Sequence, residues 1–456
     1  MAIDMQNRHI RSASYVALAA FVCTTSGFDV ASADIIHVPG DYPTIQGGID
    51  AADPGDTVMV AANDHHTTET TGVPVQDEFA DFAVPNDGCV VEVFSITLSE
   101  SGSIDPDTCD VHSEPGYCSV YFGTFDYDGE YMDIDYEYVT VYSERPVVNK
   151  SISLMGSGFD KTFVYGGSDQ PIVSVQAPGV LVEGFCMWSA NGWGDVAGVH
   201  VSGAGDVVIR RNMLGEMNGW GDVCGIRVDA GDGAIVTDNL IVGCGGWEDV
   251  SAIRILDSAD CVVRNNTIYD VGSWEIKAGI RFDNCPSGIV QNNIVDDIYD
   301  GYGIYCSGSV ITLSHNCFHE CGYYGVSAGP GDINSDPQFV DPWWGFVLLQ
   351  GDYHLGGDSP CIDAGDPAFV ADPGETDIDG QARVMDGDDD GLAVVDMGAD
   401  ELWSCPADIT GDGVVDVLDL LEVLSQWGGS GSADITGDGV VDVLDLLEVL
   451  AAWGPC

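Results

Sequence analysis

Two loops near the C-terminus carry oxygen-bearing side chains at the spacing of a calcium site. The sequence DITGDGVVDVLDLLEVL begins at Asp408 and again at Asp434, with a glycine at loop position 6, where a calcium loop turns sharply. We predict calcium as the cofactor, because so many oxygens converging on one loop would repel one another without a cation. The alternative is an acidic helical pair without a metal. The expected ligands, with the valine carbonyl at position 7, are Asp408, Thr410, Asp412, Val414, Asp416 and Asp419 in the first loop and Asp434, Thr436, Asp438, Val440, Asp442 and Asp445 in the second.

Basic and aromatic side chains recur every 27 residues in the middle of the chain. His200, Arg227, Arg254 and Arg281 occupy one position of this repeat, and their apolar neighbours predict that the basic side chains point outward from a strand. Seven residues earlier, the repeat carries a tryptophan. Indole faces can stack on sugar rings, and guanidinium groups can bind carboxylates or sulfates through two hydrogen bonds.

These two columns supply the candidate site residues of the central region. The residues expected to bind a substrate are Trp193, Trp220, Trp247, Trp274, Arg227, Arg254 and Arg281. In an enzyme, the acid or base would have to come from His200, Arg254, Arg281 or Lys277. The alternative is structural: Asp229, Asp283 and the aspartates of the tryptophan-bearing loops neutralise the arginines, and the tryptophans pack over them.

The same 27-residue period predicts the elements that position these side chains. Segments beginning at Gly198, Gly225, Ala252 and Gly279 contain short alternating strands separated by turns rich in Gly, Asp and Asn. We predict an all-β fold in which each unit forms one coil of a parallel β-helix, or solenoid. Stacked asparagines can hydrogen-bond from coil to coil. The asparagines that close the four segments are Asn212, Asn239, Asn266 and Asn293.

Residues 35–330 resemble the pectin-lyase-like right-handed parallel β-helix family. The resemblance rests on the repeated coils and on an opening, IHVPGDYPTIQ from Ile36 followed by GDTVMV, that is similar to the first coil of pectinesterase-like proteins. It implies that a polysaccharide lies along the outward strand face, with arginine or lysine as the base in enzymes of the family. The Gly-His-Gly, Arg-Ile-Lys, Arg-x-Pro-x-x-Arg and paired-aspartate motifs of those enzymes are missing.

The function predicted from these features is the binding of an acidic extracellular polysaccharide. Whether the protein also cleaves it, as a polysaccharide lyase or a glycoside hydrolase, stays open because no acid and base set is identified. The alternative is a noncatalytic cell-surface structural or adhesion protein, which needs neither the arginine nor the tryptophan column.

Changes in composition divide the chain into four parts. Residues 1–33 carry arginines, a short apolar run and a final Ala-Ser-Ala, which is typical of a signal peptide, so we predict a secreted or cell-surface protein. The β-helix is expected at residues 34–330, with an inserted lobe at residues 64–145 whose three cysteines are expected to form disulfides. Residues 331–403 are the expected C-terminal cap, which shields the strand edges of the last coil, and residues 404–456 the calcium-binding module.

Residues 404–456 resemble a dockerin, in which two calcium loop–helix units lack the leading helix of a full EF-hand. An aspartate at position 12 of each loop matches that family, whereas the threonine at position 3 is a weaker ligand than the usual Asn or Asp. The resemblance implies attachment to a cohesin-like or cell-surface partner. Cys405 and Cys456 bracket the module and are expected to clasp its ends.

The charge balance limits the partners of the protein. The chain has 75 acidic and 13 basic residues, a formal net charge of −62. Such a surface repels nucleic acid and anionic membranes, so neither is an expected partner. After the signal peptide, no segment is long and apolar enough to insert into a membrane. The hydrophobic content of 45% is that of a globular protein rather than of a disordered acidic tail.

Overall fold

The computed structural model describes most of the chain between Ala33 and Pro455. The described residues are 33–63, 65–74, 79–82, 94–97, 101–103, 117–127, 131–166, 170–342, 351–372, 374–387, 391–402, 407, 409–410, 414–429, 431–436 and 439–455. The predicted signal peptide lies outside them up to residue 32, as do Cys89, Cys109, Cys405 and Cys456.

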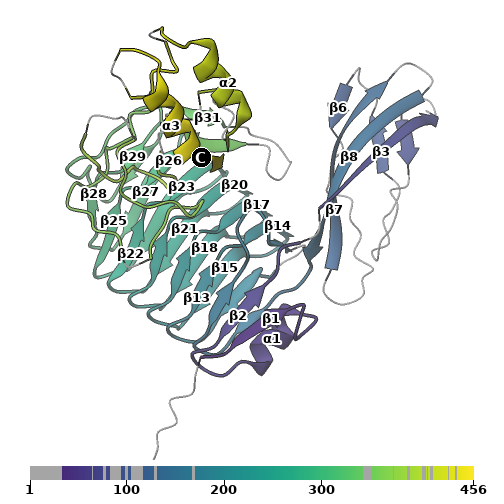
Figure 1. The fold of residues 1–456 in the computed structure, drawn as a ribbon. Helices are drawn as coiled ribbons and strands as arrows, with labels where there is room; N and C mark the ends of the chain where they lie inside the picture. The colour runs from purple at the N-terminus through teal and green to yellow at the C-terminus, as the bar shows by residue number, and fades with distance from the viewer. Residues whose placement is uncertain are drawn as a thin grey trace, which may run out of the picture. The chain divides into compact units, whose positions relative to one another are not determined.

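Short parallel strands stack into three sheets along the middle of the chain, as the teal part of Figure 1 shows. Each full coil gives one strand to each sheet, so the prediction of an all-β parallel β-helix is confirmed. The first sheet contains β1 (Ile35–Val38), β2 (Thr57–Val60), β10 (Ser153–Met155), β13 (Leu181–Glu183), β16 (Val208–Arg210), β19 (Ile235–Thr237), β22 (Cys261–Arg264), β25 (Gly288–Gln291) and β28 (Thr312–Ser314).

The other two sheets run beside the first and complete each coil. The second sheet contains β3 (His65–Pro74), β6 (Ser101–Ser103), β7 (Tyr117–Tyr127), β8 (Tyr131–Tyr142), β11 (Phe163–Tyr165), β14 (Cys186–Gly192), β17 (Met213–Gly219), β20 (Leu240–Gly246), β23 (Thr267–Gly272), β26 (Ile294–Asp296) and β29 (Cys317–Phe318). The third sheet contains β9 (Val147–Val148), β12 (Val173–Val175), β15 (Val196–Ser202), β18 (Val223–Asp229), β21 (Val250–Leu256), β24 (Lys277–Asp283), β27 (Tyr302–Ser307) and β30 (Gly322–Tyr324).

Apolar residues at the same place in successive coils form the core. On the third sheet, Val199 lies opposite Ile226, Ile226 opposite Ile253, and Ile253 opposite Ile280. All four side chains are completely buried. Burying one side chain of this size stabilises the fold by about 1.5–3 kcal/mol, so the repeat sets the register as well as the fold.

The predicted asparagine ladder is confirmed at the turn between the first and second sheets. The Asn239 side-chain amide donates to Asn266 Oδ1 at 3.0 Å and to the carbonyls of Ile209 and Thr237 at 3.0 and 2.9 Å. Its own Oδ1 accepts the Asn212 backbone N–H and side-chain amide, both at 3.1 Å. The asparagines are fully buried with their hydrogen bonds satisfied, which specifies the stacking of one coil on the next.

In the first coil, a short helix connects β1 to β2. Helix α1 (Ile45–Ala51) begins after Thr44, whose hydroxyl accepts the Gly47 N–H.

The described strands between residues 65 and 142 are antiparallel. In this region β8 pairs antiparallel with β3 and β7, and β4 (Phe79–Phe82) pairs with β5 (Phe94–Thr97). Tyr142 at the end of β8 pairs parallel with Val164 of β11, so the second sheet of the solenoid begins there.

The chain continues past the last coil and covers one face of the solenoid. Ile333 still pairs with Cys317 of the last coil. The following residues, here called the returning segment (described at 334–342, 351–372, 374–387 and 391–402), then run along the outer face of the second sheet. Strands β31 (Phe339–Asp341) and β32 (Asp352–Leu355) form a hairpin there. The outward face of the second sheet is apolar and needs this cover. The buried cluster contains Met213, Leu240, Tyr269 and Ile294 from the sheet and Phe339, Tyr353, Leu355, Cys361, Ile378 and Met397 from the returning segment.

Two short helices follow the two predicted calcium loops. They are α2 (Val417–Ser425) and α3 (Val443–Ala451), and β33 (Val414–Val415) pairs with β34 (Gly454–Pro455). Each helix begins with the same aspartate capping box.

No helix in the described part of the chain is long and apolar enough to cross a membrane. The cysteines described as free thiols are Cys186, Cys224, Cys244, Cys261, Cys285, Cys306, Cys317, Cys321 and Cys361.

Candidate functional site

The basic column runs across the third sheet where the sequence places it. His200 lies opposite Arg227, Arg227 opposite Arg254, and Arg254 opposite Arg281. Their strand neighbours point into the core, so these side chains lie on the outer face. Tyr305 of β27 continues the column, with its ring centre 5.0 Å from the guanidinium carbon of Arg281.

Each arginine bonds a loop aspartate of the preceding coil and an aspartate at the end of a strand. Arg254 Nη1 donates to Asp222 Oδ2 at 2.6 Å, and its Nε donates to Asp283 Oδ2 at 3.1 Å. Arg281 Nη1 donates to Asp249 at 2.7 Å, and its Nε shares Asp283 at 2.7 Å. Asp283 therefore links two neighbouring arginines.

At the N-terminal end of the column, the basic side chains are paired with aspartates in the same way. Arg227 Nε bonds Asp229 at 3.0 Å and its Nη1 lies 3.4 Å from Asp195, while His200 Nε2 lies 3.0 Å from Asp229. The exposed fraction of the side chain falls from 19% at Arg227 to 12% at Arg254 and 8% at Arg281. The pairs of Arg254 and Arg281 with Asp283 are the best covered, and salt screens them less than the Arg227–Asp195 pair, whose aspartate is 64% exposed.

The ion pairs shift the pKa values of Arg227, Arg254 and Asp229 against the effect of burial. Burial alone would lower the pKa of Arg227, but its bonds to Asp229 hold that pKa above its ordinary value. Burial likewise opposes a raised pKa at Arg254, which the nearby Cys224 and Asp222 nevertheless raise. Asp229 is half-buried, and its bonds to His200 and Arg227 lower its pKa despite that burial. The surroundings of Arg227 and Arg254 therefore favour their protonated forms.

The four tryptophans stack on one another at the corner between the second and third sheets. Ring centres of successive indoles are 5.1, 4.8 and 5.5 Å apart, and their planes differ by 16°, 6° and 12°. The end members, Trp193 and Trp274, are each 78% exposed, and the inner Trp220 and Trp247 are 48% and 49% exposed. The inner faces pack against each other, so the column presents a strip of indole edges to solvent.

Lys277 does not belong to either column. It begins β24 opposite Val250 and is half-buried, four residues before Arg281 on the same strand. The structure therefore brings His200 together with the three arginines, leaves Lys277 apart from them, and gathers the tryptophans in a separate column.

The structure describes part of the two predicted calcium loops. Asp408, Asp412 and Asp438 and the side chain of Val414 lie outside the described residues. In the first loop, Asp419 is fully buried. It accepts the Thr410 N–H at 2.9 Å through Oδ1 and the Asp416 N–H at 2.8 Å through Oδ2, which places three predicted ligands around one point. The described ligands of the second loop, which lie before and at the start of α3, are Asp434, Thr436, Val440, Asp442 and Asp445.

The second loop repeats this arrangement. Asp445 is fully buried, and its Oδ1 accepts both the N–H and the hydroxyl of Thr436 at 3.0 Å. Its Oδ2 accepts the Asp442 N–H at 2.7 Å, and Asp434 Oδ2 accepts the Gly439 N–H at 2.8 Å. The backbone hydrogen bonds from Thr436 and Asp442 lower the pKa of Asp445. A buried, ionised carboxylate at position 12 suits a hard cation with oxygen ligands such as calcium.

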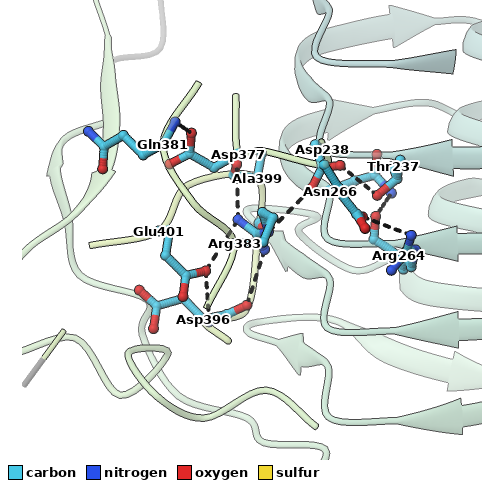
Figure 2. A network of polar contacts seen from close by, with 12 residues as sticks. Thr237, Asp238, Arg264, Asn266, Asp377, Gln381, Arg383, Asp396, Ala399 and Glu401 are labelled. Atoms are coloured by element: carbon cyan, nitrogen blue, oxygen red, sulfur yellow. Dashed lines mark hydrogen bonds and ion pairs between the residues drawn. The ribbon is translucent and has the colours of Figure 1, made fainter. Parts of the chain in front are cut away.

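Sequence reasoning missed a buried charge network between the returning segment and the solenoid. Figure 2 shows Arg383 between Asp238 on one side and Glu401 and Asp396 on the other. Its side chain is completely buried, 3.5 Å from Asp238 Oδ1 and 3.5 Å from Glu401 Oε2, and it donates to the Gly398 carbonyl at 2.9 Å. These residues share no period, so the repeat offered no signal for the contact.

Two histidine clusters were also missed, because their members come from separate loops. His319 Nδ1 lies 2.8 Å from Asp296 Oδ1, with Asp336 nearby. The second cluster, around His354 of β32, combines three further aspartates of the returning segment. Short Asp-x-His and Asp-x-Asp spacings at Asp352 and Asp379 were the only sequence signal for it.

Comparison with known proteins identifies the repeat. Residues 186–335 match the family model of the right-handed β-helix region, and the strands described above therefore form a right-handed parallel β-helix. No curated protein matches the chain. Among solved structures, the chain is similar to a mutant of the PL6 family alginate lyase AlyGC, with 11% sequence identity and a TM-score of 0.15. The alignment covers 76% of this chain and 60% of that enzyme, so the chain spans less than two thirds of its length.

Replacing Arg254 with alanine is expected to lower stability. The change leaves Asp222 without its guanidinium partner and takes one of two partners from Asp283. For ion pairs that are largely but not fully buried, the loss is about 2 kcal/mol, between the values for exposed and buried pairs. Thermal unfolding followed by circular dichroism measures it. An unchanged melting temperature would contradict a structural role for the column.

Proposed function

We propose that this chain is an exported, noncatalytic polysaccharide-binding protein whose contact surface is the tryptophan column of Trp193, Trp220, Trp247 and Trp274. The observation that carries the proposal is the stack of four aligned indoles, each about half-exposed or more. A contiguous exposed aromatic strip is costly in water and is typical of an interaction surface. The exposed indole edges are apolar surface that an extended sugar chain can cover, which is a hydrophobic contact rather than stacking on the indole faces.

The absence of catalysis in this proposal follows from the pairing of the basic column. Among the described residues of the column, each arginine is bonded to two aspartates, and His200 is bonded to Asp229. Five aspartates surround three arginines and one histidine there. The aspartates outnumber the basic groups, so the column is negative as a whole and disfavours the carboxylates or sulfates of an acidic polysaccharide. Contact through the uncharged indoles is better supported.

A structural surface protein is the second candidate. The ion pairs and the asparagine ladder both connect each coil to the next, which favours a role in rigidity. Under this alternative the indole stack contributes only packing. The two candidates differ in whether a change in the tryptophans affects binding or only stability.

Calcium would be held by the oxygen ligands of the C-terminal loops. The fit rests on Asp419 and Asp445, whose buried carboxylates already gather the other described ligands of each loop. A bound calcium ion would supply positive charge that offsets the repulsion between these oxygens. We infer that the module then attaches the protein to a cohesin-like or cell-surface partner.

The test of the binding proposal is the double variant Trp220→Ala/Trp247→Ala. Covering the edges of two indoles removes apolar surface from water and contributes about 1–3 kcal/mol in total, so the affinity for a bound polysaccharide is expected to fall about 10–100-fold. Affinity electrophoresis in gels that contain the polysaccharide measures it. Tyr299→Ala is the matched control, because Tyr299 is 80% exposed and lies outside the stack. Full retention of the double variant would sink the proposal and favour the structural alternative.

A further inference from the structure

A histidine in the returning segment is surrounded by carboxylates on every side that its ring nitrogens reach. His354 Nε2 lies 2.9 Å from Asp379 Oδ2, and His354 Nδ1 lies 2.5 Å from Asp352 Oδ1. A carboxylate oxygen of Asp400 completes a set in which the ligand atoms of His354, Asp379 and Asp400 all lie within 4.8 Å of one another.

This cluster has more negative charge than the histidine can offset. Even a fully protonated imidazole balances only one of the three carboxylates. Asp400 is 6% exposed, and its Oδ2 accepts the Leu355 N–H at 3.1 Å. The guanidinium of Arg383 interacts with Asp400 as well, but that group is shared with Asp238 and Glu401.

A fourth carboxylate beside the cluster has an unused oxygen. Asp377 is completely buried, and its Oδ1 accepts the N–H groups of residues 379, 380 and 381. Its Oδ2 is buried and has no hydrogen-bond partner in the described part of the chain. Asp377 stands two residues before Asp379 in the same loop. A buried oxygen without a partner is destabilising unless something binds it.

We propose that His354, Asp379 and Asp400 bind a divalent transition-metal ion, with zinc as the best match, and that Asp352 orients the histidine. One imidazole nitrogen with carboxylate oxygens is a zinc ligand set, whereas calcium and magnesium prefer oxygen alone. A dication neutralises Asp379 and Asp400 together. Asp352 then accepts the second ring N–H of His354, which is the usual partner of a metal-bound histidine. The same loop also carries Asp377, whose Oδ2 has no hydrogen-bond partner in the described part of the chain.

The proposed ion lies at the wall of a small cavity. His354 and Asp400 line a space of about 90 Å³ between the returning segment and the second sheet, together with Met213, Leu240 and Tyr353. This space gives the ion room for a water molecule or another small ligand. Zinc would thereby link β32 to the loops that carry Asp379 and Asp400 within the returning segment, next to an apolar cavity that Met213 and Leu240 of the solenoid also line.

Zinc binding to the purified full chain tests the proposal. The protein is stripped with dipicolinate and titrated with zinc by calorimetry, with calcium held at saturation so that the C-terminal loops are filled. We expect the wild type to bind one more zinc ion than His354→Gln, and Asp352→Asn to bind that ion about 10–100-fold more weakly. His319→Gln is the matched control, because His319 also pairs with an aspartate, and it should bind like the wild type.

Folding is checked by circular dichroism for each variant. If His354→Gln does not fold, Asp379→Asn takes its place, since that side chain is 27% exposed and its replacement keeps the shape. Equal zinc stoichiometry and affinity in the wild type and the folded ligand variant would overturn the proposal. A loss in His319→Gln instead would assign the ion to the cluster of Asp296, His319 and Asp336 and overturn it equally.

Discussion

Replacement of Arg383 with methionine is expected to destabilise the protein by about 3–5 kcal/mol, the usual cost of removing one member of a buried ion pair. Arg383 is completely buried between Asp238 of the solenoid and Glu401 of the returning segment (Figure 2). Methionine fills a similar space but leaves both carboxylates without that cation. We expect the segment 351–402 to separate from the second sheet before the coils unfold.

Thermal unfolding and hydrogen exchange of residues 351–402 measure this effect. Lys161→Met is the matched control, because the Lys161–Asp160 pair is exposed, with side-chain exposures of 59% and 47%. An exposed pair of this kind contributes about 0–1 kcal/mol. Arg383→Met with the melting temperature and exchange rates of the control would show that the network does not hold the segment.

The same network predicts how stability depends on pH. Burial raises the pKa of Asp238 to about 7, even though Arg383 opposes the shift, and burial also raises the pKa of Asp396 and Glu401. A carboxyl group whose pKa is higher in the folded state binds its proton more tightly there, so its contribution to stability is lost as pH rises through the folded pKa. The protection factors of amides in the returning segment, corrected for the intrinsic exchange rate at each pH, are therefore expected to be lower at pH 9 than at pH 5.

Removal of calcium is expected to have the second large effect. At a calcium concentration 1,000 times the dissociation constant, each site would stabilise the folded module by about 4 kcal/mol. EGTA should therefore lower the melting temperature of the module in the full chain and reduce the helical signal of α2 and α3. The empty loops lose order because their buried carboxylates have no cation.

A pair of substitutions assigns this effect to the loop. Asp445→Asn removes a fully buried ligand and should abolish much of the response of the second loop to calcium. Glu448→Gln is the control, since Glu448 is exposed on α3 and outside the ligand set. A circular dichroism spectrum and melting temperature that ignore EGTA would contradict the calcium assignment.

The coil register and the asparagine ladder could be predicted because both repeat at one fixed spacing. A residue such as Asn239 needs only its counterparts 27 residues away, and every strand of the coil obeys the same period. The outward direction of Arg254 followed in the same way from its buried neighbours. The periodic part of the fold is thus a local property of the sequence.

The pairing of the arginines could not be decided from the period alone. Arg254 reaches Asp222, 32 residues earlier, only because the loop aspartate of one coil lies over the strand of the next. The mutual stacking of Trp220 and Trp247 depends on how the loops turn at the corner. The sequence predicts the pairing of the arginines with aspartates only as an alternative, and in that alternative the tryptophans pack over the arginines rather than on one another. Side-chain direction in loops is not fixed by alternation.

The contacts of the returning segment were beyond sequence reasoning altogether. Arg383 meets Asp238 across the second sheet, and His354 meets Asp379 and Asp400 across separate loops. A cap was predicted from the need to cover the strand edges of the last coil. The sequence pattern did not indicate that the outer face of the second sheet also needs cover, because outward residues such as Met213 and Leu240 were not recognised as a second apolar surface.

The central claim is that the chain binds a polysaccharide through its tryptophan column and does not cleave it. The most direct test is to incubate the wild type with neutral, uronate-containing and sulfated polysaccharides at low and high salt. Retention is followed by affinity electrophoresis, and cleavage by ultraviolet absorbance of unsaturated products and by new reducing ends. We predict that at least one polysaccharide retards the protein and that this retardation persists at high salt, because an apolar contact is not screened by ions. We also predict that no cleavage product of the polysaccharide forms. Release of product, or retention by none of the polysaccharides, would contradict the claim.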